Sequence, residues 1–156
     1  MHRSSIKHMA YFRDKYVSLL SDPTILDVGS RRMSSRSYKL TYRDVFFGYK
    51  YTGMDIVPGR NVDIVGYENI KAVYDVLISG QVMEHVKQPW HWLTSLTPYF
   101  KKYICVIAPH TCAEHRLPID TYRYFPDGMR DLFDYAGTEE VEIIKDKYET
   151  VGIGKL

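Results

Sequence analysis

Apolar residues gather in short runs along the chain, and Gly, Pro, Asp and Ser separate these runs. Such runs are typical of strands that are buried in a sheet. The runs at 74–79 and 103–108 are apolar enough to be buried on both faces. We expect strands at residues 24–28 (with a tight turn at Gly29 and Ser30), 51–56, 62–65, 74–79, 103–108, 141–144 and 151–153.

Between several of these runs the apolar spacing changes to that of a helix. Met9, Phe12 and Tyr16 recur on one face, and Asp22 with Pro23 then ends the pattern. Proline is tolerated in the first turn of a helix, so Pro89 marks a helix start. We expect helices at residues 6–20, 89–98 and 127–135, and less regular helical segments at 34–47, 67–73 and 82–86.

Strands that alternate with helices predict an α/β fold. We expect a doubly wound, mostly parallel, seven-stranded Rossmann-like sheet with helices on both faces. The last two strands form an antiparallel pair at its edge. At 156 residues the chain is expected to be one domain, with an N-terminal helix at 1–22 and an α/β core at 23–156.

The net charge and the lengths of the apolar stretches limit the kinds of partner that the chain is expected to bind. A net charge of +2 gives no electrostatic reason for a nucleic-acid or membrane partner, so neither is expected. No apolar stretch approaches the ~20 residues that span a bilayer, and the N-terminus lacks the apolar centre of a signal peptide. We therefore expect a cytoplasmic protein.

The two cysteines, Cys105 and Cys112, are too few for a disulfide framework and are expected to be reduced thiols. Cys112 stands three residues before His115, which is a spacing that metal ligands use. These two residues supply only half of a metal site, so no metal is expected.

Two strand ends indicate a ligand. The first strand closes on Gly29, where a backbone without a side chain can approach a ligand closely. The second ends in Asp55, whose carboxylate can accept hydrogen bonds from ribose hydroxyls. This order of glycine and acid is typical of nucleoside-binding α/β sheets.

With these residues in place, the chain resembles the class I S-adenosylmethionine-dependent methyltransferases, particularly those with small-molecule acceptors. Four segments carry the resemblance in order: 25–30, 53–56, 74–79 and 82–86. The last contains Glu84 and His85, a pair that often follows the fourth strand in this family. The resemblance implies S-adenosylmethionine as cofactor and S-adenosylhomocysteine as product.

The resemblance also implies a cofactor position at the carboxyl ends of the strands. Gly29 and the backbone of Ser30 would face the methionine moiety, and Asp27 would orient its amino group. Asp55 would bind the ribose, with Ile56 against the adenine. The remaining residues would line the adenine edge (Asp63 or the 66–68 segment with Tyr67) and close over the methionine end (Ser79, Gly80 and Gln81).

The chain departs from the family pattern in its first loop. Arg31 and Met33 stand where the family usually has two further glycines. A dinucleotide, which sets its pyrophosphate on this loop, needs those glycines most. NAD-dependent oxidation is therefore less favoured than S-adenosylmethionine binding. If Arg31 and Met33 fill the methionine pocket, the chain is instead a degenerate, non-catalytic binding or scaffold domain.

Methyl transfer to a hydroxyl needs a base, for which histidine is suited near neutral pH. His85, His110 and His115 follow the fourth and fifth strands and are the candidates, and each has an alternative role as a packing or solvated residue.

The long 110–126 loop is the expected acceptor site, with Asp120, Tyr122 and Arg123 contacting the acceptor. The alternative is an ordered loop in which Asp120 pairs with Arg123 while Tyr122, Tyr124 and Phe125 cover the core. We therefore expect a methyltransferase for a small polar acceptor, such as a sugar or glycan hydroxyl. A second copy or a partner chain would complete the site if the acceptor is larger.

Overall fold

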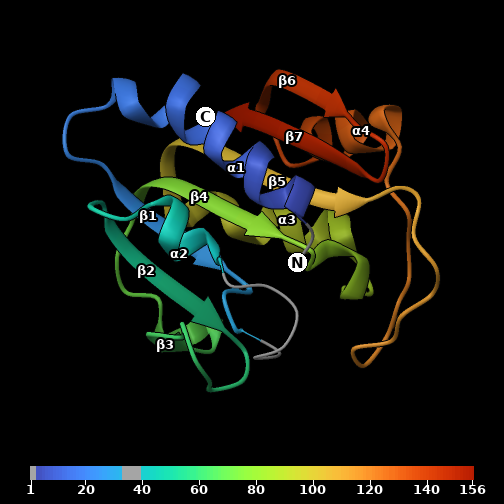
Figure 1. The fold of residues 1–156 in the computed structure, drawn as a ribbon, viewed down its shortest axis with the longest axis horizontal. Coiled ribbons are helices and arrows are strands. Elements are labelled where there is room, and N and C mark those ends of the chain that lie inside the picture. Colours follow the sequence, from blue (N-terminus) through green and yellow to red (C-terminus); the bar gives the residue numbers. More distant parts are fainter. Residues whose placement is uncertain (1–2, 33–39) are drawn as a thin grey trace.

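A computed structural model describes residues 3–32 and 40–156. One seven-stranded sheet crosses the molecule in the order β3-β2-β1-β4-β5-β7-β6 (Figure 1). Its strands are β1 (Thr24–Val28), β2 (Lys50–Asp55), β3 (Ile64–Val65), β4 (Tyr74–Gly80), β5 (Phe100–Pro109), β6 (Glu139–Lys145) and β7 (Glu149–Lys155).

The expected doubly wound, mostly parallel sheet is confirmed. Strands β1 to β5 pair in parallel, whereas β7 is antiparallel to both β5 and β6. The last two strands form the expected antiparallel pair, with β7 inserted beside β5 and β6 at the edge. The fifth strand includes Pro109, which the apolar run alone placed beyond the strand end; β7 pairs with β5 along its length as far as Pro109.

Helices cover both faces of the sheet. On one face lie α1 (Arg3–Lys15) and α2 (Tyr42–Val45), in front of the sheet in Figure 1. On the other lie α3 (Pro89–Leu96), which begins at Pro89 as expected, and α4 (Pro126–Tyr135). Four single turns of 3-10 helix complete the elements: η1 (Val17–Leu19), η2 (Tyr67–Asn69), η3 (Met83–His85) and η4 (Thr97–Tyr99).

Several expected helices are shorter in the structure. The first ends at Lys15. Tyr16 leaves the helical conformation, and its ring lies tilted against Tyr103 while its hydroxyl donates a hydrogen bond to Glu142. The expected segments at 67–73 and 82–86 are single 3-10 turns. Of the expected 34–47 segment, residues 34–39 lie outside the described residues, and the rest contributes only α2.

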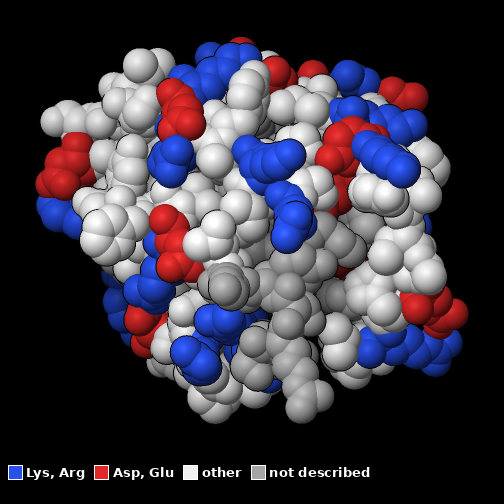
Figure 2. Space-filling view, viewed as in Figure 1, with Lys and Arg blue, Asp and Glu red and all other residues white. Residues whose placement is uncertain are grey.

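The apolar core alternates along each strand, as two-sided burial requires. Ile25 faces α1 and packs with Met9 and Phe12. Its neighbour Leu26 faces the opposite side, where Leu93 of α3 lies. Figure 2 shows that basic and acidic side chains are mixed on the face that carries α1. Among the described residues, no helix has the length and apolar character that a bilayer crossing requires.

Helix α4 packs closely on β7 because glycines stand beneath it. A Cβ at Gly152 would lie 2.7 Å from Phe133 and 2.8 Å from Met129. A Cβ at Gly128, within α4 itself, would meet no atom within 4 Å. The two glycines therefore respond oppositely to the same added methyl group.

We predict that Gly152→Ala lowers the free energy of unfolding by about 1–3 kcal/mol, because the added methyl overpacks the α4 interface. The matched change Gly128→Ala should raise it by about 0.5–1 kcal/mol through helix propensity. Urea titration monitored by circular dichroism measures both. Equal effects of the two changes would contradict this packing.

Candidate cofactor and acceptor site

A cavity of about 630 Å³ lies where the direction of strand addition reverses, between the ends of β1 and β4. Open α/β sheets bind ligands at this reversal. The cavity is lined by Asp27, Gly29, Ser30, Arg31, Arg32, Leu40, Thr41, Tyr42, Met54, Asp55, Ile56, Val57, Tyr67, Gly80, Gln81, Val82, His85, Val86, Trp92, Leu117 and Pro118. Many of the predicted cofactor residues are therefore brought together.

Asp27 brings a buried carboxyl group to this cavity. It lies near the end of β1, is only 3% exposed, and accepts a hydrogen bond from the Tyr51 hydroxyl. Burial raises the pKa of the Asp27 carboxyl to about 7, although the Tyr51 hydrogen bond and the charge of Arg43 lower it. A cationic ligand group beside Asp27 would offset this burial.

Asp55 closes β2 on the same cavity. Its carboxylate accepts hydrogen bonds from the backbone N–H of Val57 at 3.0 Å and of Arg31 at 3.3 Å. The Arg31 guanidinium lies 3.8 Å from the same carboxylate. The Arg31 stem packs over Gly59, where a Cβ would lie 2.9 Å away, so this side chain follows the loop after β2. Met33 lies outside the described residues.

The glycine that ends β1 has a packing role as well as a place at the cavity. Gly29 has a φ of +84°, and a Cβ here would lie 2.1 Å from a methyl group of Val82. The N–H groups of Gly29 and Ser30 both donate to the Met54 carbonyl, at 2.8 and 3.0 Å. These two N–H groups hold the β1 turn against β2.

Some predicted cofactor residues serve the fold and lie outside the cavity lining. The Ser79 hydroxyl donates to the Val28 carbonyl at 2.8 Å, which ties β4 to β1. The Asp63 carboxylate accepts the Gly53 N–H at 2.7 Å and pairs with Arg43.

Four other predicted cofactor residues do reach the cavity. Ile56 is 67% exposed and offers an apolar surface beside Asp55. The Tyr67 hydroxyl accepts a hydrogen bond from the Trp92 indole at 2.7 Å. Gly80 and Gln81 line the β4 side, and the Gln81 amide donates to Glu149 at 3.1 Å.

The three candidate histidines occupy different places. His85 lines the main cavity. His110 lies in a neighbouring cavity of about 670 Å³ with Pro109, Thr111, Cys112, Ala113, Tyr148 and Glu149. Both ring nitrogens of His110 are engaged, one with the Thr111 hydroxyl at 2.6 Å and one with the Asp146 carbonyl at 2.9 Å. His85 therefore shares a cavity with the predicted cofactor residues, whereas His110 lines a different one.

In the 110–126 loop, Asp120 pairs with Arg123, as the alternative interpretation of the sequence expected. Arg123 donates two hydrogen bonds to Asp120, at 2.6 and 2.7 Å, and the His115 N–H donates a third at 2.7 Å. The Arg123 hydrogen bond is the main cause that holds the pKa of Asp120 well below its usual range. Tyr124 is buried, but Tyr122 and Phe125 are exposed, so only the first of these rings covers the core.

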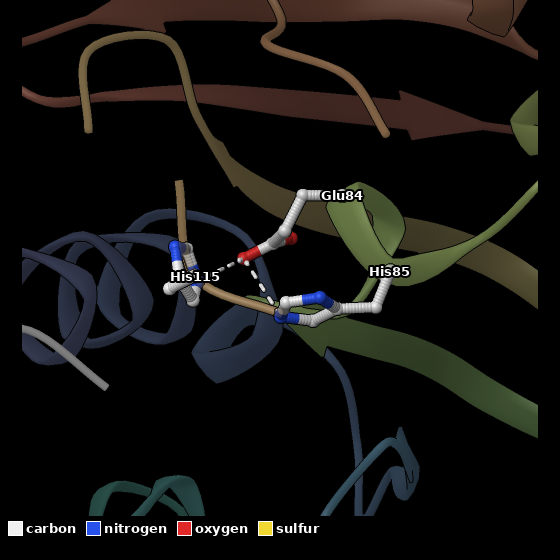
Figure 3. A group of neighbouring side chains, drawn as sticks. All are labelled: Glu84, His85 and His115. Carbon is white, nitrogen blue, oxygen red and sulfur yellow. Dashed lines mark ion pairs between the residues drawn. The ribbon is translucent and has the colours of Figure 1, made fainter. Parts of the chain in front are cut away.

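A cluster of Glu84, His85 and His115 adjoins the cavity, and both imidazoles point at the carboxylate (Figure 3). The Glu84 side chain is fully buried, and neither of its oxygens has a hydrogen-bond partner among the described residues. Burial raises the pKa of the Glu84 carboxyl to about 7. The sequence signal was the Glu84–His85 pair, but nothing in the sequence placed His115 beside it.

We predict that the free energy of unfolding falls as pH rises from about 4 to about 7, because folded Asp27 keeps a proton that the unfolded chain releases. The contribution of Asp27 reaches up to about 1.4 kcal/mol per pH unit, and Asp27→Asn should remove it. Tyr51, Arg43 and Asp55 surround this carboxyl and are unchanged in the variant.

Urea unfolding of both proteins across this pH range measures the slope. The control Asp131→Asn, at an exposed position on α4, should keep the wild-type slope. An Asp27→Asn slope equal to that of the wild type would contradict the assignment.

No protein-family model and no curated protein sequence matches the chain. Solved structures do match its fold. Magnesium protoporphyrin IX methyltransferase (ChlM) from Synechocystis PCC 6803, with bound SAH, superposes with a TM-score of 0.67 at 12% identity, covering 99% of this chain and 83% of that one. A SAM-dependent methyltransferase from Aquifex aeolicus gives a TM-score of 0.65 at 17% identity, with 99% and 98% covered.

A third match is the N-terminal domain of EvdMO1, in the presence of SAH and D-fucose. Its TM-score is 0.64 at 14% identity, and 99% of this chain and 83% of that chain are covered. At these identities the likeness concerns the fold. Taken with the strand order and the cavity at the reversal point, it shows that the chain has the class I S-adenosylmethionine-dependent methyltransferase fold.

Proposed function

We propose that this protein binds S-adenosylmethionine and methylates a hydroxyl group of a small polar acceptor, of which a sugar is the favoured class. One observation carries the proposal. Asp27 and Asp55, near the ends of neighbouring strands β1 and β2, line a single cavity at the reversal point of the sheet. Two acids so placed suit this cofactor, which carries an ammonium group on its methionine part and two hydroxyl groups on its ribose.

The residues present fit the cofactor. Its ammonium group would compensate the buried Asp27 carboxyl, which now has only the Tyr51 hydroxyl as hydrogen-bond partner among the described residues. The ribose hydroxyls would meet Asp55, and the exposed face of Ile56 beside it would cover the adenine. A volume of about 630 Å³ lies within the range of about 300–1,000 Å³ that ligand sites occupy.

When bound, the sulfonium supplies an activated methyl carbon: the acceptor oxygen forms the new C–O bond, the C–S bond breaks, sulfur keeps its electron pair, and the hydroxyl loses its proton. The chain's own task is alignment of the acceptor. His85, Leu117 and Pro118 line the side of the cavity nearest the long loop, so they would contact the acceptor. Asp120 and Arg123 would not contact the acceptor directly, because they are paired with each other and lie outside the cavity lining.

Support for a sugar acceptor comes from the EvdMO1 domain, whose structure was determined in the presence of SAH and D-fucose. The cavity of this protein is lined both by polar groups and by the apolar side chains of Trp92, Leu117 and Pro118. Such a mixed surface suits a sugar, which has one polar edge and one apolar face.

We predict that calorimetric titration gives micromolar binding of S-adenosylhomocysteine and no binding of NAD. Asp55→Ala should weaken the former by about 10–100-fold, since hydrogen bonds to a charged group contribute about 1.5–3 kcal/mol. Asp131→Ala, at an exposed position, is the matched control and should bind like the wild type. Mass spectrometry of a sugar panel incubated with S-adenosylmethionine then tests for transfer of one methyl group.

The outcomes separate the alternatives. Unchanged affinity of the Asp55 variant would refute the cofactor placement. Absence of S-adenosylhomocysteine binding would overturn the proposed function and favour a binding or scaffold domain. Binding of NAD alone would favour an oxidoreductase.

A further inference from the structure

We propose that Glu84, His85 and His115 bind one divalent transition-metal ion through a carboxylate oxygen and the two Nε2 atoms. Glu84 and His85 come from η3, and His115 comes from the long loop that follows β5 (Figure 3). The three ligand atoms all lie within 4.8 Å of one another. Sequence alone predicts no metal here, because the third ligand is brought in only by folding.

The spacing of these atoms favours a shared ion over direct pairing. Glu84 Oε1 lies 3.8 Å from His85 Nε2 and 3.9 Å from His115 Nε2. Both distances are longer than the hydrogen bonds of about 2.7–3.2 Å that a direct contact would make. Two ligands of one tetrahedral zinc ion stand about 3.3–3.5 Å apart, given bonds of about 2.0–2.2 Å. A shift of about half an ångström brings the carboxylate oxygen to this distance from each imidazole, and the two imidazole nitrogens, within 4.8 Å of each other, need to approach by about 1.5 Å at most.

The contacts of both Nδ1 atoms are those that metal-bound histidines make. His85 Nδ1 lies 2.6 Å from the Ile119 carbonyl, and His115 Nδ1 lies 3.1 Å from the Ala113 carbonyl. A carbonyl only accepts, so each Nδ1 carries the proton, and in a neutral ring Nε2 then presents its lone pair. Metal-bound histidines are held in this way by a partner on the other nitrogen. Both lone pairs face the Glu84 carboxylate.

Hydrogen bonds hold the 110–126 loop against η3 and so set the distance between His115 and Glu84. The Thr121 N–H and hydroxyl both donate to the Glu84 carbonyl, at 2.7 and 2.8 Å. Asp120 holds the His115 backbone N–H and is itself fixed by Arg123. The predicted acceptor residues Asp120 and Arg123 are thus assigned as positioning residues for His115.

The second group of potential ligands in the described chain makes a useful contrast. His8 pairs directly with Asp146 at 2.8 Å, and Glu149 accepts hydrogen bonds from Ser5 and Gln81. Each side chain of this second group therefore has at least one direct partner, although Glu149 Oε2 has none among the described residues. In the Glu84 cluster, a fully buried carboxylate has no hydrogen-bond partner among the described residues, and burial of such a charge is costly.

Two imidazoles and one carboxylate favour Zn²⁺, Co²⁺ or Fe²⁺ over Mg²⁺ and Ca²⁺, which prefer oxygen ligands. Three protein ligands leave a coordination position open. Because His85 also lines the main cavity, we expect that position to be reached from the cavity. The ion would bind the acceptor hydroxyl oxygen and lower its pKa, and the proton would leave to water. This last role rests on the proposed function; the metal site itself does not.

We expect apo-protein, prepared by dialysis against a chelator, to bind one Co²⁺ per chain with a visible absorption band. Glu84→Gln, His85→Ala and His115→Ala should each weaken Co²⁺ binding by about tenfold or more. The controls Glu114→Gln and His91→Ala change an exposed residue of each type and should bind Co²⁺ like the wild type. Competition with Zn²⁺ gives the affinity.

His115→Ala is the variant that best preserves folding, because this side chain is 36% exposed and on a loop. Circular dichroism checks that each variant is folded, and S-adenosylhomocysteine titration of Glu84→Gln and His115→Ala, whose residues lie outside the cavity lining, checks that the cofactor pocket is intact. Absence of Co²⁺ binding by the wild type, or equal binding by His115→Ala, would overturn the metal site. If the wild type binds Co²⁺ but not S-adenosylhomocysteine, the metal site stands and the proposed function fails.

Acetohydroxamate, an oxygen-donor probe, tests the open coordination position. Its addition to the Co²⁺ protein should shift the absorption band. An unchanged spectrum at saturating probe would refute an open position and with it the role in acceptor binding.

Discussion

The reversal of strand order between β1 and β4 is the constraint on which the site depends. The chain leaves β1 toward β2 and β3, then returns to place β4 on the other side of β1. The loops after β1 and β4 therefore diverge, and the cavity opens between them. Two hydrogen bonds fix the edges of this opening: Ser79 donates to the Val28 carbonyl, and the Gln81 N–H donates to the Ile107 carbonyl. Asp27, Asp55 and Gln81 take their positions in the cavity from these strand ends.

Strand ends were also what the sequence could predict best. Burial on both faces makes a strand a continuous apolar run, so its end is visible where a glycine or an acid follows. Asp27 and Asp55 could therefore be placed at one cavity. Ser79 also ends an expected strand, but its hydroxyl donates to the Val28 carbonyl. Asp63 lies within the expected third strand, and its carboxylate accepts the Gly53 N–H. The strand register and the loop geometry determine these hydrogen-bond partners, and neither can be predicted from the pattern of apolar and polar residues.

The histidines show the same limit in another way. His85 and His110 both follow a strand end, yet only His85 lines the cavity. His110 turns toward β7, because the antiparallel pairing of β5 with β7 brings the Asp146 carbonyl within 2.9 Å of its ring. Hydrophobic pattern predicted that β7 exists and that it pairs with β6, but not that it lies between β5 and β6. Without that neighbour, the two histidines were equivalent.

The strongest functional signal is a difference between two carboxylates with buried side chains: Asp120, on the 110–126 loop, and Glu84, which the same loop contacts. Asp120 accepts two hydrogen bonds from Arg123 and one from the His115 backbone, so its charge is stable within the fold. Glu84 is at least as buried, but two imidazole nitrogens face it at distances too long for hydrogen bonds. The hydrogen bonds of Asp120 already hold this loop in place, so the Glu84 cluster is not needed for that purpose. The Glu84 arrangement is explained by a cation, since a cation satisfies the carboxylate and both lone pairs together.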